Sequence, residues 1–424
     1  MAVILYLTTI VVAWLLAILY APVKQQITVL GLLRPLESWQ NVHGIENHII
    51  QDTIACEDLH YHEQSGLLYS ACQGDLVKAA GWFPGAWSLD YPKNPASGSL
   101  VVIDPKTMKA RKLSLENFYS DIFVTHGISL YTPPDDQKTI YILAINHLPN
   151  PLWTPTSSEH SKAASRVEVF VHKIGSNKAK HIRSISHPLI RTPNDLLALS
   201  ENEFLVTNDH YYLDGYMRLV EELFHPAWTD LLHVHANDAD NVTATVSLTS
   251  VPGNNGLGWG PNGQVLTSDA TAGSIYFADF QDHNKTLSVS HSIQADGVVD
   301  NPFFFSDPYA GVDGKDYSGY LLPGIGRAGD FLTNYKDPTG KAPLTSLVYF
   351  LPASAGKKDS EDSGKKPILV FSDDGSSLRG ATTAVIVAID PATNDGKRQG
   401  WLFVTGVIAP HMLATKIDFP TTLA

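Results

Sequence analysis

The sequence predicts an all-β protein, a six-bladed β-propeller preceded by a hydrophobic amino-terminal segment. Short runs rich in Val, Ile, Tyr and Phe recur between Gly, Pro, Asn and Asp turns, and such runs are typical of strands. No long helical periodicity follows the amino-terminal segment. The runs fall into a loose repeat of six units, which a propeller explains better than a two-sheet sandwich, because each blade is a separate four-stranded sheet.

Each unit is expected to begin with the strand that lines the central channel. The units begin near Cys56, Thr125, Thr192, Gly253, Val299 and Arg379. One helix is expected, over Gly215–Phe224. The stretch from Gly324 to Gly329 is predicted to be a turn and not a phosphate-binding loop, because no helical pattern follows it. The charged, Ser- and Gly-rich stretch from Ala353 to Lys366 is predicted to be a flexible surface loop.

The composition excludes one class of partner. Asp and Glu number 43 against 30 Lys and Arg, so the net charge is −13 and a nucleic-acid partner is not expected. An excess of acidic residues is compatible with the binding of divalent cations. A solvated acidic surface is the simpler explanation of the composition when it is considered alone. No G-x-S-x-G elbow is present to indicate a serine hydrolase.

The amino terminus predicts membrane attachment. The run from Val3 to Leu19 carries no charge, which is near the lower limit for spanning a bilayer and long for the apolar part of a signal peptide. We therefore expect an uncleaved signal-anchor over residues 1–22 and a propeller domain over 40–424, with a cleaved signal as the alternative. The glycosylation triplets at Asn241 and Asn284 favour a lumenal or extracellular body, either membrane-anchored or secreted.

The chain contains two cysteines, Cys56 and Cys72, with no zinc-type or redox spacing. They flank a short turn around Gly66. A disulfide across a hairpin and two buried free thiols both remain open.

Unusual polar residues concentrate at the starts of the units. They are Glu57-Asp58, His126, Asn194-Asp195, Asn254-Asn255 and Asp300-Asn301, roughly one group per blade. Any single Asn-Gly or Asn-Asp pair is explained by a turn. Side chains at the same phase of successive blades converge on the axis, however, where buried carboxylates must be paired or must coordinate a metal.

Adjacent polar residues in these groups predict two metal ions. Neighbours in an extended chain point in different directions, so Glu57-Asp58 and Asn194-Asp195 can each serve two sites. Oxygen ligands without Cys favour calcium over zinc or copper. Glu57 and Asp300 would balance the charge of one Ca²⁺, and Asp58 and Asp195 that of a second.

Seven segments in order resemble the serum paraoxonase/arylesterase family: CEDLHYH, HGISLY, LAINH, PNDLLAL, TNDHYYLDGY, NNGLGWGPNG and VDNP. The resemblance runs from about Val42 to the carboxyl terminus, with an expanded region between Tyr309 and Lys366. In mammalian members of that family a disulfide ties the first and last strands together. No cysteine stands near Trp39 or Ala414 here, so closure is expected from strand pairing alone, or with a Cys56–Cys72 link nearby.

The resemblance implies specific site residues. A catalytic calcium would be held by Glu57, Asn194, Asn255, Asp300 and Asn301. A structural calcium would be held by Asp58, Asp195 and the backbone carbonyl of Ile128. A histidine dyad falls on His126 and His147, and a supporting pair on Asp209 and His210. Asn254 is a rival for Asn255. The substrate pocket is assigned to Phe83, Tyr216 and His411, with Trp82 as a further aromatic candidate.

The activity implied is calcium-dependent hydrolysis of a small-molecule lactone or aryl ester. Calcium would polarise the carbonyl, His126 would act as general base and His147 would orient it. Glu57 is a competing base, and a core histidine satisfied by backbone groups is the simplest alternative reading of His126. Two other functions compete: a gluconolactonase or strictosidine-synthase type of propeller enzyme, and a non-catalytic, calcium-stiffened binding propeller at a membrane surface. The adjacent Glu57-Asp58 and the HGIS segment at His126 argue against the first. The second would not require His126, His147 and Asn301 together.

Overall fold

The computed structural model describes residues 20–90, 95–156, 159–239, 241–337 and 339–419, together with Trp14 and Ile18; residue 223 is described by its backbone only. Most of the run from Val3 to Leu19, predicted to be a signal-anchor, lies outside these residues. In the described part of the chain, no helix has the length and apolar character needed to cross a membrane. The described amino-terminal segment is helical over residues 20–29.

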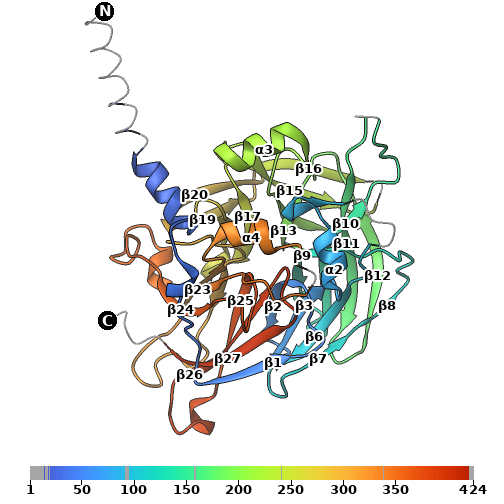
Figure 1. Cartoon of the computed structure of the whole chain (residues 1–424). Coiled ribbons are helices and arrows are strands. Elements are labelled where there is room, and N and C mark those ends of the chain that lie inside the picture. The colour runs from blue at the N-terminus through green and yellow to red at the C-terminus, as the bar shows by residue number, and fades with distance from the viewer. Residues whose placement is uncertain are drawn as a thin grey trace, which may run out of the picture.

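Six sheets stand around a common axis, each with its first strand innermost (Figure 1). The first blade comprises β2 (Cys56–His62), β3 (Leu67–Cys72), β6 (Ser99–Asp104) and β7 (Lys109–Lys112). The second comprises β9 (Thr125–Tyr131), β10 (Thr139–Pro149), β11 (Ala163–Lys173), β12 (Lys178–Ile185) and the parallel edge strand β8 (Ser114–Glu116). The third comprises β13 (Pro193–Ala198), β14 (Glu203–Asn208), β15 (Thr229–Ala236) and β16 (Val242–Val251).

The remaining blades follow the same plan. The fourth comprises β17 (Asn254–Trp259), β18 (Gln264–Asp269), β19 (Ser274–Gln281) and β20 (Thr286–Gln294). The fifth comprises β21 (Phe303–Phe305), β22 (Gly319–Gly324), β23 (Ser346–Pro352) and β24 (Ile368–Asp373). The sixth comprises β25 (Ala381–Ala388), β26 (Gln399–Gly406), β27 (Met412–Asp418) and β1 (Glu46–Ile50). A short hairpin, β4 (Trp82–Phe83) with β5 (Ser88–Leu89), lies outside the blades.

The inner strands β2, β9, β13, β17, β21 and β25 contact one another in that order, and β25 contacts β2, so the ring is closed. This confirms the predicted six-bladed propeller. The predicted unit starts fall within one residue of the inner strand in the first four blades and within four in the last two. In the fifth blade the chain already pairs at Asn301, which bridges to Thr383, before β21 begins.

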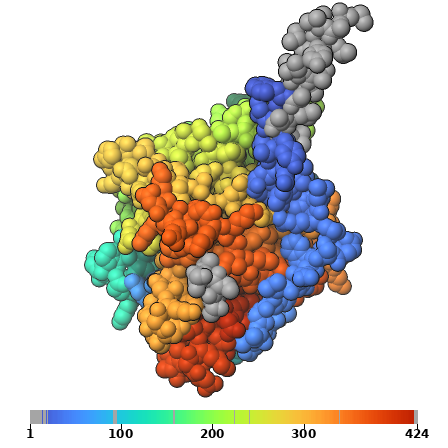
Figure 2. Space-filling model, turned by 90° about the vertical axis from the view of Figure 1, so that its left-hand side faces the viewer, coloured from blue at the N-terminus to red at the C-terminus, as the bar shows by residue number. Residues whose placement is uncertain are grey.

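Strand pairing closes the propeller, as expected from the missing family disulfide. β1 pairs antiparallel with β27 from Glu46 opposite Lys416 to Ile50 opposite Met412. Cys56 and Cys72 form a disulfide between β2 and β3 in the first blade. Figure 2 shows the amino-terminal segment running down beside the carboxyl-terminal blades, and Val42 bridges to Ser372 there. Apolar side chains such as Phe371, Leu402 and Val404 pack between adjacent blades.

Three short helices lie on the side of the propeller where the inner strands begin (Figure 1). They are α2 (Leu76–Gly81), α3 (Gly215–Phe224) and α4 (Ala328–Asn334). Each follows the second strand of a blade, which ends beside the start of the first strand because the two are antiparallel. The predicted helix at Gly215–Phe224 is confirmed. Short 3₁₀ turns complete the chain at Leu36–Ser38, Pro84–Ala86, Pro261–Gly263, Ala353–Gly356 and Pro391–Thr393.

Two loop predictions were incomplete. A helix, α4, does follow the glycine-rich stretch from Gly324 to Gly329. Seven residues are too few to show a helical period, and tertiary contacts such as the Ala328 N–H bond to the carbonyl of Leu30 hold them. The stretch from Ala353 to Lys366 begins with a 3₁₀ turn whose Ala355 and Gly356 are buried, so this end of the loop is packed.

Candidate functional site

The inner strand starts bring the predicted polar residues together on the axis. The side-chain Nδ2 of Asn301 donates to Oε1 of Glu57 at 2.8 Å, across 244 residues of sequence. The N–H of Leu257 on β17 donates to Asp195 on β13 at 2.6 Å. Two motif glycines permit this approach: a Cβ on Gly256 would lie 2.4 Å from the Cα of Asn301, and one on Gly127 would lie 2.7 Å from the carbonyl oxygen of Asn194.

One side-chain oxygen is left without a hydrogen-bond partner on each residue predicted to hold the catalytic calcium. Within the described residues, these buried atoms are Oε2 of Glu57 and Oδ1 of Asn194, Asn255, Asp300 and Asn301. Buried polar groups in folded proteins are almost always paired. Carboxylate and amide oxygens are the ligands that calcium prefers, so this set fits a calcium ion.

The structure separates the rivals Asn254 and Asn255. The side chain of Asn254 is fully used: its Oδ1 accepts from the Thr267 hydroxyl at 2.9 Å, and its Nδ2 donates to the carbonyl of Asp230 at 3.0 Å. Oδ1 of Asn255 has no partner among the described residues. The geometry therefore favours Asn255 as a metal ligand.

The residues assigned to a structural calcium form a second group. Asp58 accepts from the N–H of Ile128 at 2.9 Å and of Leu59 at 2.7 Å, and His60 Nε2 lies 3.0 Å away. Asp195 accepts from the backbone N–H of Leu196 at 2.7 Å. The contact between Asp58 and Ile128 is made by the N–H of Ile128; a ligand role for its carbonyl stays a prediction.

Four carboxyls, those of the buried Glu57, Asp58 and Asp195 and of the half-buried Asp300, lie close enough to influence one another. Burial raises the pKa of Glu57 well above its usual value, and the charges of Asp300, Asp58 and Asp195 raise it further. Burial and the charge of Asp58 likewise raise the pKa values of Asp195 and Asp300. Burial also opposes the ionisation of Asp58, but the charge and hydrogen bond of His60 and two backbone N–H groups lower its pKa overall. Such a cluster ionises fully only beside added positive charge.

No three His, Cys, Asp or Glu side chains are grouped as a metal site within the described ranges. The predicted catalytic site does not require such a group, because only Glu57 and Asp300 are carboxylates. Its other ligands would be amide oxygens, which are hard ligands suited to calcium and not to zinc.

The two predicted catalytic histidines are in direct contact. Nδ1 of His126, on β9, lies 2.9 Å from Nε2 of His147, on β10, and both rings are buried. Burial lowers the pKa of His126 to about 4, against the opposing charges of Asp209 and Asp58. Burial and the neighbouring His126 lower the pKa of His147 well below its usual value. Both imidazoles are therefore neutral near pH 7.

The predicted supporting pair belongs to a charged network on the α3 side of the site. Oδ1 of Asp209 lies 3.0 Å from Nδ1 of His210, without the alignment of a hydrogen bond. His210 Nε2 contacts Glu222 at 3.2 Å, and the buried guanidinium of Arg218 contacts the same carboxylate at 2.9 Å. A Cβ on Gly85 would lie 2.9 Å from the His126 ring and 3.5 Å from Asp209, so all three come close together.

The predicted pocket residues lie in different places. Phe83 is buried with its ring centroid 4.5 Å from that of His126 and 5.7 Å from that of His147. Tyr216 lies on the first turn of α3 and is 90% exposed. His411 is half-buried and contacts the carbonyl of Ser377 at 2.8 Å. The structure brings Phe83 to the dyad, and the pocket roles of Tyr216 and His411 stay predictions.

Residues 75–313, more than half of the chain, match the arylesterase family. The chain belongs to the arylesterase family. That match includes His126, His147, Asn194, Asn255 and the Asp300-Asn301 pair.

Three curated relatives illustrate the similarity to this arylesterase-family chain. Serum paraoxonase/arylesterase 2 of Gallus gallus is 28% identical over 229 residues, covering 52% of this chain and 56% of the relative. Serum paraoxonase/arylesterase 1 of Mus musculus is 29% identical over 223 residues, with the same 52% and 56% coverage. Serum paraoxonase/lactonase 3 of Oryctolagus cuniculus is 27% identical over 301 residues, covering 70% of this chain and 73% of the relative. The chain thus spans little more than half the length of the first two relatives.

Two solved structures resemble the arylesterase-family chain more distantly. A luciferin-regenerating enzyme aligns with a TM-score of 0.45 and 9% identity, covering 87% of this chain and 92% of its own. A gluconolactonase from Xanthomonas campestris aligns with a TM-score of 0.42 and 12% identity, covering 90% and 94%.

Several residues of the arylesterase-family site were not predicted from the sequence. Nδ1 of His147 lies 2.8 Å from the hydroxyl of Ser165 on β11, and Thr383 on β25 donates to the carbonyl of Glu57 at 2.9 Å. Trp82 was a candidate for the pocket, but its contact with the dyad was not predicted: its indole Nε1 donates to the carbonyl of His147 at 2.8 Å. Ser165 is the direct cross-strand partner of His147, so only the register of this hairpin could have identified it.

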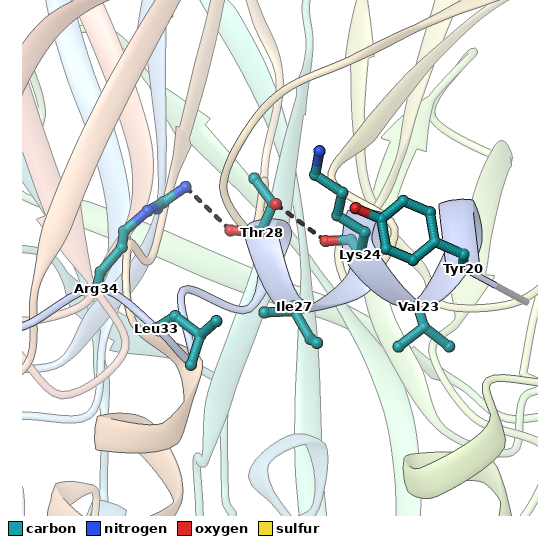
Figure 3. A pocket seen from close by; sticks show the side chains of 7 residues that line it. All are labelled: Tyr20, Val23, Lys24, Ile27, Thr28, Leu33 and Arg34. Carbon is teal, nitrogen blue, oxygen red and sulfur yellow. Dashed lines mark hydrogen bonds between the residues drawn. The ribbon is translucent and has the colours of Figure 1, made fainter. Parts of the chain in front are cut away.

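Two hollows lie outside the axial site. One, at the base of the amino-terminal helix, has a volume of about 640 Å³ and is lined only by residues of that segment, among them Tyr20, Ile27 and Arg34 (Figure 3). The other is an open cavity of about 1410 Å³ between the second and third blades, and Ser165 is part of its wall.

Proposed function

We propose that this chain is a calcium-dependent hydrolase of lactones and aryl esters. The observation that carries the proposal is the set of five buried oxygens that have no partner among the described residues, together with a buried pair of neutral histidines. Family membership supports it, since the relatives carry the names arylesterase, paraoxonase and lactonase.

Two calcium ions are proposed. Glu57, Asn194, Asn255, Asp300 and Asn301 would hold the catalytic ion. Asp58, Asp195 and the carbonyl of Ile128 would hold the structural one. When bound, the catalytic ion supplies the positive charge that polarises a substrate carbonyl. The four clustered carboxyls carry four negative charges when ionised, which two calcium ions balance.

The histidine pair supplies the general base. The contacts fit a tautomer in which His126 donates from Nδ1 to His147 and His147 donates from Nδ1 to Ser165. We assign this tautomer because it leaves the lone pair on Nε2 of His126. That nitrogen accepts a proton from water as the water oxygen bonds to the carbonyl carbon. The ester C–O bond then breaks, and His126 returns the proton to the departing oxygen.

Phe83 and Trp82 hold the dyad in place. Phe83 packs edge-on against both imidazoles, and the Trp82 indole fixes the backbone of His147. Burial lowers the pKa of His126, because desolvation disfavours the imidazolium, and Phe83 packs on this buried ring.

We also propose that residues 1–22 attach the protein to a membrane of the secretory pathway, with the propeller on the lumenal or extracellular side. Asn241 and Asn284 are both exposed, and the Thr286 hydroxyl donates to Oδ1 of Asn284 at 2.7 Å. Expression in a secreting eukaryotic cell should give a glycosidase-sensitive mass that falls in Asn241→Gln and Asn284→Gln. A mass unaffected by glycosidase would contradict a lumenal body.

The hydrolase proposal is tested with the full-length protein in detergent. γ- and δ-lactones and phenyl acetate are assayed with calcium and with chelator, in the wild type, His126→Gln and Asn301→Ala. His48→Gln is the control, since this histidine is half-exposed on β1, where it contacts Glu46 and the ring of Trp401. We expect calcium-dependent turnover in the wild type and control, and its loss in both site variants. Calcium binding without hydrolysis of any ester would instead indicate a binding propeller.

A further inference from the structure

The cavity between the second and third blades lies at the edge of the proposed catalytic centre. Its walls come from the end of the β10–β11 hairpin, the connection from β12 to β13 and the segment between β14 and α3. All three lie at the end of the propeller where the inner strands begin. The volume of about 1410 Å³ is ample for a small organic molecule.

Ser165 connects this cavity to the dyad. Its hydroxyl lies 2.8 Å from Nδ1 of His147, and Ser165 lines the cavity. Thr192, also in the lining, accepts the N–H of Asp209 with its carbonyl and donates its hydroxyl to the carbonyl of His210. Residues of the cavity wall therefore contact the dyad directly, through Ser165, and its supporting pair, through Thr192.

The charge of the lining is opposite to that of the whole chain. Lys162, Arg166 and Arg191 line the cavity, and Asp214 is the single carboxylate in its described lining, although the chain carries a net charge of −13. The carboxylates that balance the arginines, Glu168 and Asp230, lie outside the lining. The cations are 23–30% exposed at their side chains, so they are accessible but held in place.

Hydrogen-bonding capacity remains on these cations. Arg166 contacts Glu168 through Nε at 2.6 Å, and its two terminal nitrogens make no hydrogen bond within the described residues. Nε of Arg191 is buried and also lacks a partner in the described chain. A guanidinium with unused N–H groups is suited to a carboxylate, which it can bind through two parallel hydrogen bonds.

Aromatic rings accompany two of the cations. The guanidinium of Arg191 stands 4.7 Å from the centre of the Tyr211 ring, and Nζ of Lys162 stands 5.5 Å from that of Trp153. Cation–π contacts orient the charges while leaving their outer donors available. The same rings offer flat apolar surface to the carbon skeleton of a ligand.

We infer that this cavity binds the carboxylate of an organic acid with an apolar or aromatic body. The role of this binding site rests on the proposed function, since ester and lactone hydrolysis generates a carboxylate. The carboxylate has two sources: the acid product of the reaction, or a second acidic group on the substrate. In both cases Arg166 and Lys162 are specificity-determining contacts.

Binding is tested without turnover. Isothermal titration of the full chain with 2-naphthoate and with neutral 2-naphthamide, with calcium and with chelator, measures the contribution of charge independently of hydrolysis. We expect naphthoate to bind at least tenfold more tightly than the amide, and Arg166→Gln to remove about tenfold of its affinity. Lys162→Gln is the second variant. The ion pair of Lys162 with Asp214 is partly exposed, so losing it leaves no buried carboxylate without a partner. Lys173→Gln, an exposed cation paired with Asp136, is the matched control.

Kinetics then distinguish the two sources. If the anion belongs to the substrate, selectivity for 4-acetoxybenzoate over phenyl acetate falls about tenfold in Arg166→Gln. If it belongs to the product, the inhibition constant of benzoate rises by that factor and the selectivity does not change. Equal binding of naphthoate and naphthamide, or the same loss in Lys173→Gln, overturns the inference. Naphthoate binding that depends on Arg166 and Lys162 without any hydrolysis would support the site and refute the proposed function.

Discussion

Asn301 and Glu57 share one hydrogen bond, from Nδ2 to Oε1 at 2.8 Å. Oδ1 of Asn301 and Oε2 of Glu57 are buried without a partner among the described residues. The bond fixes the orientation of both groups. Because Nδ2 of Asn301 is the donor, Oδ1 must face elsewhere, and Oε2 of Glu57 is left available in the same way. The two remaining oxygens, Oδ1 of Asn301 and Oε2 of Glu57, are therefore available to bind a cation.

Adjacent asparagines provide the first prediction. Asn255→Ala removes an oxygen that lacks a protein partner, so calcium affinity should fall by about tenfold or more. Asn254→Ala removes the partner of Thr267 and of the Asp230 carbonyl, so it should lower the free energy of unfolding by about 1–3 kcal/mol and leave the calcium Kd unchanged. Calcium titration calorimetry and urea unfolding separate the two. Equal calcium affinity in wild type and Asn255→Ala would remove Asn255 from the site.

The second prediction concerns pH and metal removal. The pKa values of Glu57, Asp195 and Asp300 are raised in the folded protein. Their contribution to the stability of the metal-free fold is therefore complete at a pH below their ordinary pKa values. It is lost as the pH rises through their folded-state pKa values. Calcium binds the ionised forms. The rise in Tm on adding calcium should therefore be larger at pH 8 than at pH 5, as measured by calorimetry.

Charge variants check that interpretation. Glu57→Gln should flatten the pH dependence of the calcium effect, because it removes a carboxyl of the cluster. Asp136→Asn is the control, because this exposed carboxyl on the second blade has its pKa lowered to about 2 mainly by its hydrogen bond with Lys173. A calcium effect on Tm that is constant between pH 5 and pH 8 in the wild type would argue against calcium binding at these carboxyls.

Much of this architecture was accessible from the sequence because five of the six blades begin with a distinctive polar group. Glu57-Asp58 and Asn194-Asp195 mark the inner strands directly, and adjacency in sequence forces their side chains apart. The exposure of Tyr216 could not be predicted from the sequence. The buried face of α3 carries the charged residues Arg218 and Glu221, and not an apolar stripe that would show which residues face the solvent. The α4 helix depends on contacts with the amino-terminal segment, which no local pattern encodes.

The disulfide provides the third prediction. Cys56 precedes Glu57 directly, and its bond to Cys72 encloses a loop with a sequence separation of 16. A cross-link of that span is worth about 3 kcal/mol at 25 °C in chain entropy. The double variant Cys56→Ala/Cys72→Ala should lose about that much free energy of unfolding in urea. Treating the wild type with reductant should give a similar loss; no difference between oxidised and reduced protein would contradict the bond.

Ser165 provides the fourth prediction. Its hydroxyl is the partner of His147 Nδ1, and loss of a hydrogen bond worth about 0.5–1.5 kcal/mol lowers activity by up to about tenfold. Ser165→Ala should therefore lower kcat for phenyl acetate with little change in KM, and Ser165→Thr should restore most of it. Ser161→Ala, in the same hairpin, removes a hydroxyl that contacts only the backbone of Ala163 and should be neutral. A purely structural role would lower thermal stability without the rescue by threonine.

The low pKa of His126 provides the last prediction, and it also separates the two candidate bases. With a pKa of about 4, His126 is neutral and able to accept a proton at any pH above that value, so the acid limb of kcat/KM should lie near pH 4 and not near 6.5. Calcium nearby would lower this pKa further, because it disfavours the imidazolium. Calcium occupancy must be measured at each pH, since acid also protonates the ligands. If Glu57 were the base, His126→Gln would retain most of the activity while Glu57→Gln would lose it with calcium still bound. An acid limb near pH 6.5 at full calcium occupancy would mean that the base is a solvated histidine, and would exclude His126 as it is buried here.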